Sequence, residues 1–354
     1  MGCTAVKDVP AASTGCPAVS TSGAPKPGHL IVGMNSAWNN ACNLSALRSA
    51  GVTMERLEVD WPSVEPQRGQ WSWREFDKQF AITAQHGITM LPLLMAIPGW
   101  AGGSQYQIGA NQSGFANYVA QVVRRYGPRG SFWRANPRIP YHPARSFEIW
   151  NEPYLAQFAD GGPNPAAYAR MFKAAAIAGH KAQPAARFLL AADASAQTAS
   201  GSLIPWIAPM YRAVPDLNRY FSGIAVHPYS APHGPLDYTP GDTRFEFRRI
   251  EGVRHQFVAR GAGKKPFWIT ELGWSTCPSS PGNCNNEAQQ ATYLRQAFQK
   301  VKTSYRSWVS AMFVYNYRDS ASVTNPTDKE RWFGLIRRDG SPKPAWQVLR
   351  AEGA

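Results

Sequence analysis

Two glutamates at the ends of apolar runs carry the chemistry that this sequence suggests. Glu152 follows the run Phe147 to Trp150, and Glu271 ends the run Pro266 to Glu271. Two carboxylates that face each other across a cleft are what glycoside hydrolysis needs: one protonates the leaving oxygen, and the other attacks or activates water at the anomeric carbon. Asn151 precedes Glu152, and its amide is suited to bind a sugar hydroxyl or orient the acid. The alternative interpretation is that each glutamate is only a charge at the rim of the fold.

Three further polar side chains favour the catalytic interpretation. Arg56 lies near the end of another apolar run, where it would keep a nucleophilic carboxylate ionised or pair with Glu58 or Asp60 instead. His227 ends a third run and Tyr229 follows it, which adds an imidazole and a phenol at the same rim. The alternative for His227 is a structural role.

Aromatic residues cluster at the ends of these runs. Sugar rings present apolar C–H faces that stack on flat aromatic surfaces, so an aromatic rim suits carbohydrate, although any single tryptophan is commonly core. The cluster comprises Trp38, Trp61, Trp100, Trp150, Trp274, Tyr229, Tyr315 and Tyr317. Trp100 and Trp274 are the favoured sugar platforms because each follows its run instead of lying within it, and Trp38 and Tyr315 are further substrate-binding candidates.

Eight β-rich apolar runs alternate with helical patterns and would position these residues. Asn164-Pro165 starts one helix, over 166–181, and Asn286-Glu287 starts another, whose apolar residues recur at i, i+3, i+4 and i+7. The pattern predicts a single (β/α)8 barrel over 29–354, preceded by an extended arm over 1–28. An open doubly wound sheet is disfavoured, since no glycine-rich phosphate loop follows the first run. The runs are 29–35, 53–58, 88–95, 147–150, 188–192, 223–227, 266–271 and 310–317.

The chain resembles the retaining glycoside hydrolases of clan A, most closely the family 39 branch and its bacterial relatives. The resemblance rests on Trp150-Asn151-Glu152-Pro153 and Thr270-Glu271-Leu272-Gly273-Trp274, together with Arg56, Trp61, the segment 64–66, Gly69, His227-Pro228-Tyr229, Gly334-Leu335 and the segment 339–344. It spans nearly all of residues 29 to 350.

By position, the resemblance implies that Glu152 is the general acid/base and Glu271 the nucleophile. It also implies that Asn151 contacts the 2-hydroxyl and that Arg56 and Tyr229 support the nucleophile. Many clan members place a tryptophan at the end of the eighth strand, under the reacting sugar. Here Tyr315 is the expected substitute.

The implied activity is O-glycoside hydrolysis by double displacement, with no cofactor and no metal. A transglycosylase would use the same residues with a sugar acceptor. A carbohydrate-binding barrel without activity would keep the aromatic rim but would not need both glutamates.

The net charge of +14 suggests an anionic partner at first sight. Six arginines between Arg124 and Arg145 fall on the third helix and the connection to the fourth strand, which a barrel places opposite its catalytic mouth. Seven more cations between Arg244 and Lys265 are expected on the outer wall, around the sixth helix. We therefore expect a carbohydrate substrate, no nucleic-acid partner and no membrane span, and a monomer is favoured.

Five cysteines bear on the compartment. Cys277 and Cys284 flank a Pro/Ser/Gly/Asn turn and are expected to form a disulfide. Cys3 and Cys16 are candidates for a second bridge, which would leave Cys42 unpaired and buried, although this pairing is open. No Cys/His spacing resembles a zinc site. Loop disulfides fit a secreted or extracytoplasmic protein whose signal segment has been removed.

Overall fold

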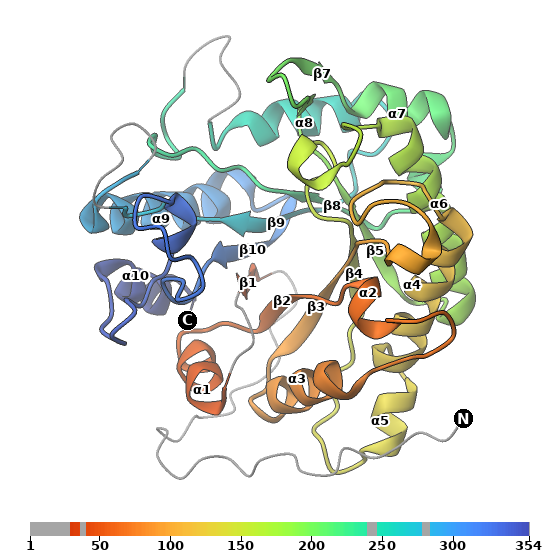
Figure 1. Cartoon of the computed structure of the whole chain (residues 1–354). Coiled ribbons are helices and arrows are strands. Elements are labelled where there is room, and N and C mark those ends of the chain that lie inside the picture. Colours follow the sequence, from red (N-terminus) through yellow and green to blue (C-terminus); the bar gives the residue numbers. More distant parts are fainter. Residues whose placement is uncertain (1–28, 36–39, 239–245, 278–283, 354) are drawn as a thin grey trace. The chain divides into compact units, whose positions relative to one another are not determined.

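Eight parallel strands form the closed barrel that the sequence predicts (Figure 1). The computed structural model describes residues 29–35, 40–238, 246–277 and 284–353, so the predicted arm over 1–28 lies outside the described residues. The strand order is β1-β10-β9-β8-β5-β4-β3-β2. The ends of every predicted run agree with the ends of its strand to within two residues. The strands are β1 (Ile31–Asn35), β2 (Met54–Glu58), β3 (Thr89–Leu94), β4 (Ser146–Ile149), β5 (Arg187–Ala191), β8 (Gly223–Val226), β9 (Phe267–Leu272) and β10 (Val309–Tyr315).

Helices alternate with the strands along the chain. They are α1 (Ala41–Ser49), α2 (Trp61–Val64), α3 (Arg74–Gln85), α4 (Gln112–Tyr126), α5 (Ser131–Ala135), α6 (Pro165–Ala182), α7 (Ile207–Ala213), α8 (Arg249–Val258), α9 (Glu287–Lys300) and α10 (Pro344–Gly353). Short helical turns add η1 (Gly99–Ala101), η2 (Ala156–Phe158), η3 (Leu217–Arg219), η4 (Val301–Tyr305) and η5 (Lys329–Arg331), and β6 (Ser195–Gln197) pairs antiparallel with β7 (Leu203–Pro205). No described helix has the length and apolarity needed to cross a bilayer.

The two predicted helix starts are confirmed by their caps. The Asn164 side chain accepts a hydrogen bond from the Ala167 amide at the start of α6, where Pro165 occupies the first turn. Asn286 and Gln289 form a capping box at the start of α9. Both arrangements satisfy amide groups that have no partner within the helix.

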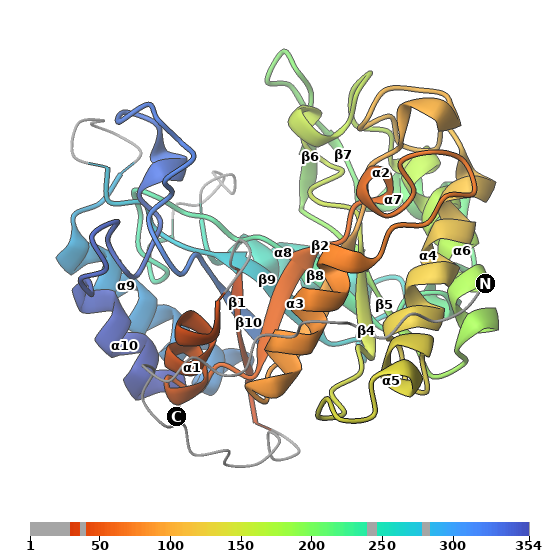
Figure 2. The same cartoon turned by 60° about the horizontal axis from the view of Figure 1, so that its bottom comes forward.

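The described chain divides into two compact parts. The first part consists of residues 57–225 and 255–265. Its strands β3, β4, β5 and β8 are paired in register, for example Leu94 with Ile149 and Ala191 with Ala225. Helices α4 and α6 lie side by side in this part (Figures 1 and 2).

The second part consists of the described residues among 15–56, 226–254 and 266–354. Here β1 lies between β10 and the start of β2, and β10 continues to β9. Helices α9 and α10 pack against each other (Figure 2). In this register Asn35 stands between Tyr315 and Arg56, so β1 and β10 end level with Arg56 of β2.

Candidate active site

Glu271 is a nearly buried carboxylate at the end of β9, in the second compact part. All six residues of this strand are buried, and Glu271 is 9% exposed. The Arg56 guanidinium donates from Nη1 to Glu271 Oε1 at 2.5 Å, and both side chains are largely removed from solvent. Arg56 is therefore paired with Glu271. Because the pair is buried, it is held by a charge-assisted hydrogen bond that water screens little.

Asn35 fixes the Arg56 guanidinium from the neighbouring strand. Its Oδ1 accepts a hydrogen bond from Arg56 Nη1 at 3.2 Å, while its Nδ2 donates to the Thr270 carbonyl at 2.7 Å. Asn35 is 6% exposed, so this bridge between β1, β2 and β9 is buried. The sequence analysis did not single out Asn35; its place as the last residue of the first strand was the available signal.

Tyr229 and His227 approach Glu271 from the end of β8. Tyr229 Oη donates to Glu271 Oε2 at 2.7 Å. His227 Nε2 lies 3.0 Å from Thr270 Oγ1, and its Nδ1 lies 3.7 Å from Glu271 Oε2. The buried imidazole thus lies beside the carboxylate, and the half-exposed phenol is bonded to it.

Both carboxylate oxygens of Glu271 accept hydrogen bonds from protein donors. His227 and Glu271 each offer a metal ligand atom, but Arg56 and Tyr229 already donate to the two carboxylate oxygens. A carboxylate that accepts from a cation and a phenol is held in a fixed orientation, which suits a nucleophile.

Arg249 holds the segment that carries Tyr229. Its guanidinium donates to the His227 carbonyl at 2.5 Å and to the Tyr229 carbonyl at 2.8 Å, on either side of Pro228. The sequence analysis placed Arg249 on the outer wall as part of the basic excess. That interpretation is wrong for Arg249, because a long side chain at the start of α8 can reach back to the preceding loop.

Tyr315 and Glu330 extend the site beyond Tyr229. The Tyr315 ring lies edge-on to Tyr229, with centroids 6.2 Å apart, and its hydroxyl donates to Glu330 Oε2 at 3.2 Å. Burial raises the pKa of Glu330, and the charge of Glu271 acts in the same direction against the opposite effects of Lys329 and Tyr315. Glu330 is thus a second carboxylate within electrostatic reach of Glu271, and it lies in a loop turn that no periodic pattern predicted.

Gly273 allows the end of β10 to pass close to the end of β9. A Cβ atom at this position would collide with the Tyr315 carbonyl oxygen. The glycine two residues after Glu271 therefore has a steric reason. It lets Tyr315 reach the level of the carboxylate.

Glu152 and Asn151 lie in the first compact part, directly after β4. Trp150 and Glu152 have φ values of 69° and 39°, in the left-handed region that residues other than glycine rarely adopt. The Trp150 amide donates to the Leu94 carbonyl, and the Glu152 carbonyl accepts from the Leu155 amide. Such conformations cost about 1–3 kcal/mol each and concentrate at functional sites. Asn151 is 7% exposed and Glu152 is half-buried.

The tryptophans divide between the core and partly exposed positions. Trp274 is 1% exposed; its indole donates to the His233 carbonyl and its ring packs beside Tyr293. The prediction that Trp274 stacks against sugar is therefore wrong, since no ring face is open. Trp100 is partly exposed, with its indole bonded to the Glu65 carbonyl and Arg68 above its ring. Trp38 lies outside the described residues.

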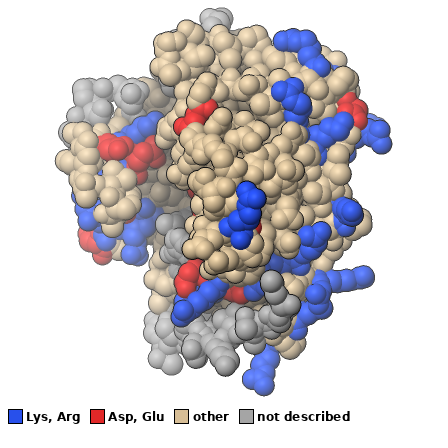
Figure 3. Space-filling view, turned by 45° about the vertical axis from the view of Figure 1, so that its right-hand side comes forward, with Lys and Arg blue, Asp and Glu red and all other residues tan. Residues whose placement is uncertain are grey.

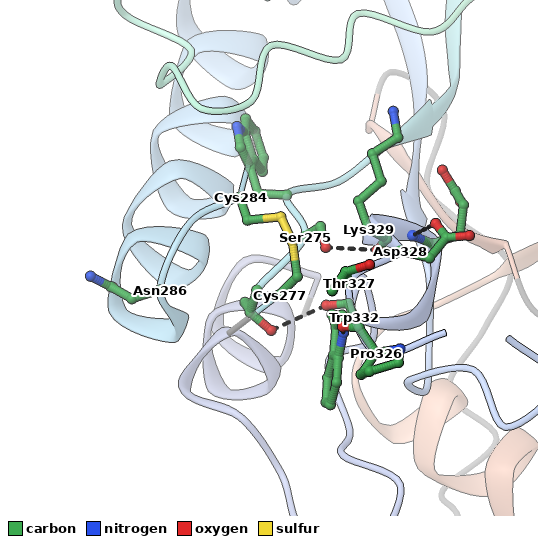
Figure 4. Close-up of a disulfide and its surroundings, with 12 residues drawn as sticks. Ser275, Cys277, Cys284, Asn286, Pro326, Thr327, Asp328, Lys329 and Trp332 are labelled. Atoms are coloured by element: carbon green, nitrogen blue, oxygen red, sulfur yellow. Dashed lines mark hydrogen bonds between the residues drawn. A yellow bond between two sulfur atoms is a disulfide. The ribbon is translucent and has the colours of Figure 1, made fainter. Parts of the chain in front are cut away.

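The disulfide between Cys277 and Cys284 is confirmed (Figure 4), with the two Cα atoms 5.5 Å apart. It follows β9, and nearby the Ser275 hydroxyl donates to the Lys329 carbonyl, which ties this loop to the turn that carries Glu330. Cys42 is exposed and disulfide-bonded, so the prediction of an unpaired, buried Cys42 is wrong. Cys3 and Cys16 lie outside the described residues.

The fold of this chain is similar to that of solved glycoside hydrolases. No protein-family model and no curated protein matches the sequence. Among solved structures, the chain is similar to a family 39 glycoside hydrolase from Bacteroides cellulosilyticus WH2, with 21% identity, a TM-score of 0.71, and coverage of 96% of this chain and 65% of that chain. The chain folds as a glycoside hydrolase barrel does.

Two further structures support this fold. A monomeric β-xylosidase from Caulobacter crescentus CB15 has 19% identity and a TM-score of 0.63, with 92% of this chain and 67% of that chain covered. Xylanase 10B from Thermotoga maritima has 14% identity and a TM-score of 0.61, with 92% and 95% covered. This chain spans about two thirds of the length of the first two enzymes. The likeness agrees with the family 39 resemblance of the sequence motifs at the level of the fold.

Proposed function

We propose that this protein is a retaining O-glycoside hydrolase in which Glu271 is the nucleophile and Glu152 the general acid/base. The observation that carries the proposal is the buried Glu271 carboxylate, which accepts from Arg56 on one oxygen and from Tyr229 on the other. Both glutamates stand at the carboxyl ends of barrel strands, where the substrates of such barrels bind.

The proposed reaction has two displacements. Glu271 attacks the anomeric carbon while protonated Glu152 donates its proton to the leaving oxygen, which forms a glycosyl ester. Ionised Glu152 then takes a proton from water, which attacks the same carbon and releases Glu271. Arg56 and Tyr229 would hold the Glu271 carboxylate in place for the attack. Asn151 would bind the 2-hydroxyl group.

The substrate proposal is a neutral glycoside or oligosaccharide. The Arg56 guanidinium is already paired with Glu271, so it does not offer its charge to an anionic substrate. Aryl β-xylosides are the first compounds to test, because similar folds include a β-xylosidase and a xylanase. The disulfide and the bonded Cys42 support an extracytoplasmic location, since such bonds persist in oxidising compartments.

Chemical rescue tests the two roles separately. Glu271→Gly should be nearly inactive towards an aryl glycoside, and added azide should give a glycosyl azide of inverted configuration. Glu152→Gly should retain activity on substrates with good leaving groups, and azide should give the retained configuration. Full activity of Glu271→Gly without azide would refute the nucleophile assignment, and an inverted hydrolysis product from the native enzyme would refute the mechanism. Glu287→Gln serves as the control, because Glu287 is a partly exposed carboxylate that is paired with Arg337.

A further inference from the structure

A basic surface lies on the first compact part, away from Glu152. Residues 121–147 contain six arginines and no Asp or Glu. Five of these arginines are exposed, and two exposed cations of neighbouring segments extend the set. We call this set the arginine face. It consists of Arg124, Arg129, Arg134, Arg138, Arg145, Lys181 and Arg187.

Several contacts bring these cations together from different elements. The Arg187 amide at the start of β5 donates to the Arg145 carbonyl just before β4, at 2.8 Å. Gln183, after α6, donates through its side chain to the Pro128 carbonyl at 2.8 Å. The packing of α4 against α6 adds to this proximity. Figure 3 shows Lys and Arg side chains on the side of the molecule that carries these helices, with few Asp or Glu side chains among them.

No ion pair among the described residues neutralises the arginine face. Arg125, the remaining arginine of residues 121–147, is paired with Asp77. Across the described ranges, none of the seven cations of the face forms an ion pair. Clustered like charges repel one another at a cost to folding, which an anionic partner would remove. The face is therefore suited to a polyanion.

An exposed aromatic ring lies among these charges. Tyr141 is 55% exposed, although its hydroxyl accepts from the Arg129 amide at 2.9 Å and its ring packs in a T-shaped pair with Trp133. The ring is thus held in place while part of it remains open. A fixed aromatic surface beside guanidinium groups suits a carboxylated sugar, because the ring stacks on the C–H face and arginine binds carboxylate with two hydrogen bonds.

We propose that the arginine face binds a carboxylated polysaccharide and retains the enzyme on an acidic glycan while the barrel mouth remains free. The choice of a polysaccharide as the partner rests on the proposed glycosidase function, whereas the expectation of an anionic partner rests on the charges of the face alone. Arg145 precedes β4 and Glu152 follows it, so the face and Glu152 lie at opposite ends of that strand. Four residues of strand span roughly 13 Å, beyond the Debye length of about 8 Å at physiological salt. Occupation of the face therefore leaves Glu152 accessible and little affected.

Binding of the full chain to polygalacturonate tests the proposal. We expect binding that weakens about tenfold or more between 50 and 200 mM NaCl, as for other charge-driven complexes, and no binding to neutral dextran. The quadruple variant R124Q/R138Q/R145Q/R187Q should lose at least about tenfold in affinity. The control R295Q/R306Q/R338Q/R350Q removes four exposed charges from the other compact part and should bind within about twofold of the native protein.

The outcomes distinguish binding at the arginine face from a general charge effect and from nucleic-acid binding. Equal losses in both quadruple variants would show that net charge alone drives binding and would overturn the proposal, as would absence of polygalacturonate binding. Tighter binding to duplex DNA than to polygalacturonate would replace the proposal with a nucleic-acid surface. Glu152→Gln should bind polygalacturonate normally, and the arginine-face variant should keep its activity on a small aryl glycoside. A failure of the glycosidase proposal is thereby distinguishable from a failure of this one.

Discussion

Breaking the buried ion pair between Lys343 and Asp319 should destabilise the part of the protein that carries Glu271. Lys343 Nζ lies 2.7 Å from Asp319 Oδ1, and both side chains are 1% exposed. The ammonium also donates to the Thr276 hydroxyl at 2.9 Å and to the Trp332 carbonyl at 3.1 Å. One cation thus joins the loop after β9, the loop after β10 and the turn next to Glu330.

The expected cost follows from burial. Lys343→Met leaves the Asp319 carboxylate buried without its cation, which costs about 3–5 kcal/mol. Burial raises the pKa of Asp319 and lowers the pKa of Lys343, in both cases against the effect of the partner, so desolvation exceeds the attraction within the pair. Removing both charges should therefore cost much less than removing one. Asn at position 319 keeps an acceptor for the Gly334 amide, which bonds Asp319 Oδ1 at 2.9 Å.

Thermal and urea unfolding measure the effect. With an unfolding entropy of about 2.1 cal/mol/K per residue, a chain of 354 residues should lose about 4–7 °C in Tm on Lys343→Met. Lys343→Met/Asp319→Asn should recover more than half of that loss, and Lys264→Met, at an exposed position, should change Tm by less than about 1 °C. A Lys343→Met protein within about 1 kcal/mol of the native free energy of unfolding, or a double variant no better than the single one, would refute the reasoning.

Three further changes test the site and its supports. Arg249→Met should lower kcat/KM about tenfold or more, because it releases the segment that carries Tyr229. Combined with Tyr229→Phe, it should lower kcat/KM by less than the sum of the two separate effects. Arg248→Met is the control, and equal effects of the two arginine variants would contradict the positioning role of Arg249. Glu330→Gln should stabilise the protein at neutral pH, because the raised pKa of Glu330 makes its ionised form unfavourable in the folded state. The difference in the free energy of unfolding from the native protein should vanish as the pH falls below the pKa of this carboxyl group in the unfolded chain. A constant difference from pH 4 to 7 would contradict this account. Replacing Cys277 and Cys284 together by serine should cost about 2.5 kcal/mol, from the entropy of a loop of this length, as measured by urea unfolding, and an unchanged midpoint would show that the disulfide does not constrain the unfolded chain.

Local sequence determined the strands and the polar residues that end them. A buried strand reads as a short apolar run, and a barrel places its functional side chains where such runs end, so Arg56, Tyr229 and Glu271 could be associated before any contact was known. Their hydrogen bonds agree with that expectation. The helix starts at Asn164 and Asn286 were equally local, because a cap depends on residues within one turn.

Tertiary structure decided what depends on packing between distant segments. Trp274 follows its strand like a rim residue, yet Tyr293 and the His233 carbonyl enclose it, which no pattern around position 274 indicates. The sequence around Arg249 and around Glu330 contains charged residues but no pattern that indicates a role. Arg249 at a helix start and Glu330 in a loop turn contact the site because these segments fold back towards strand ends. The sequence by itself thus determined which residues stand at strand ends, because that follows from local periodicity. Only the fold decided which of them are enclosed and which distant side chains hold them, because long-range contacts leave no local periodic signal.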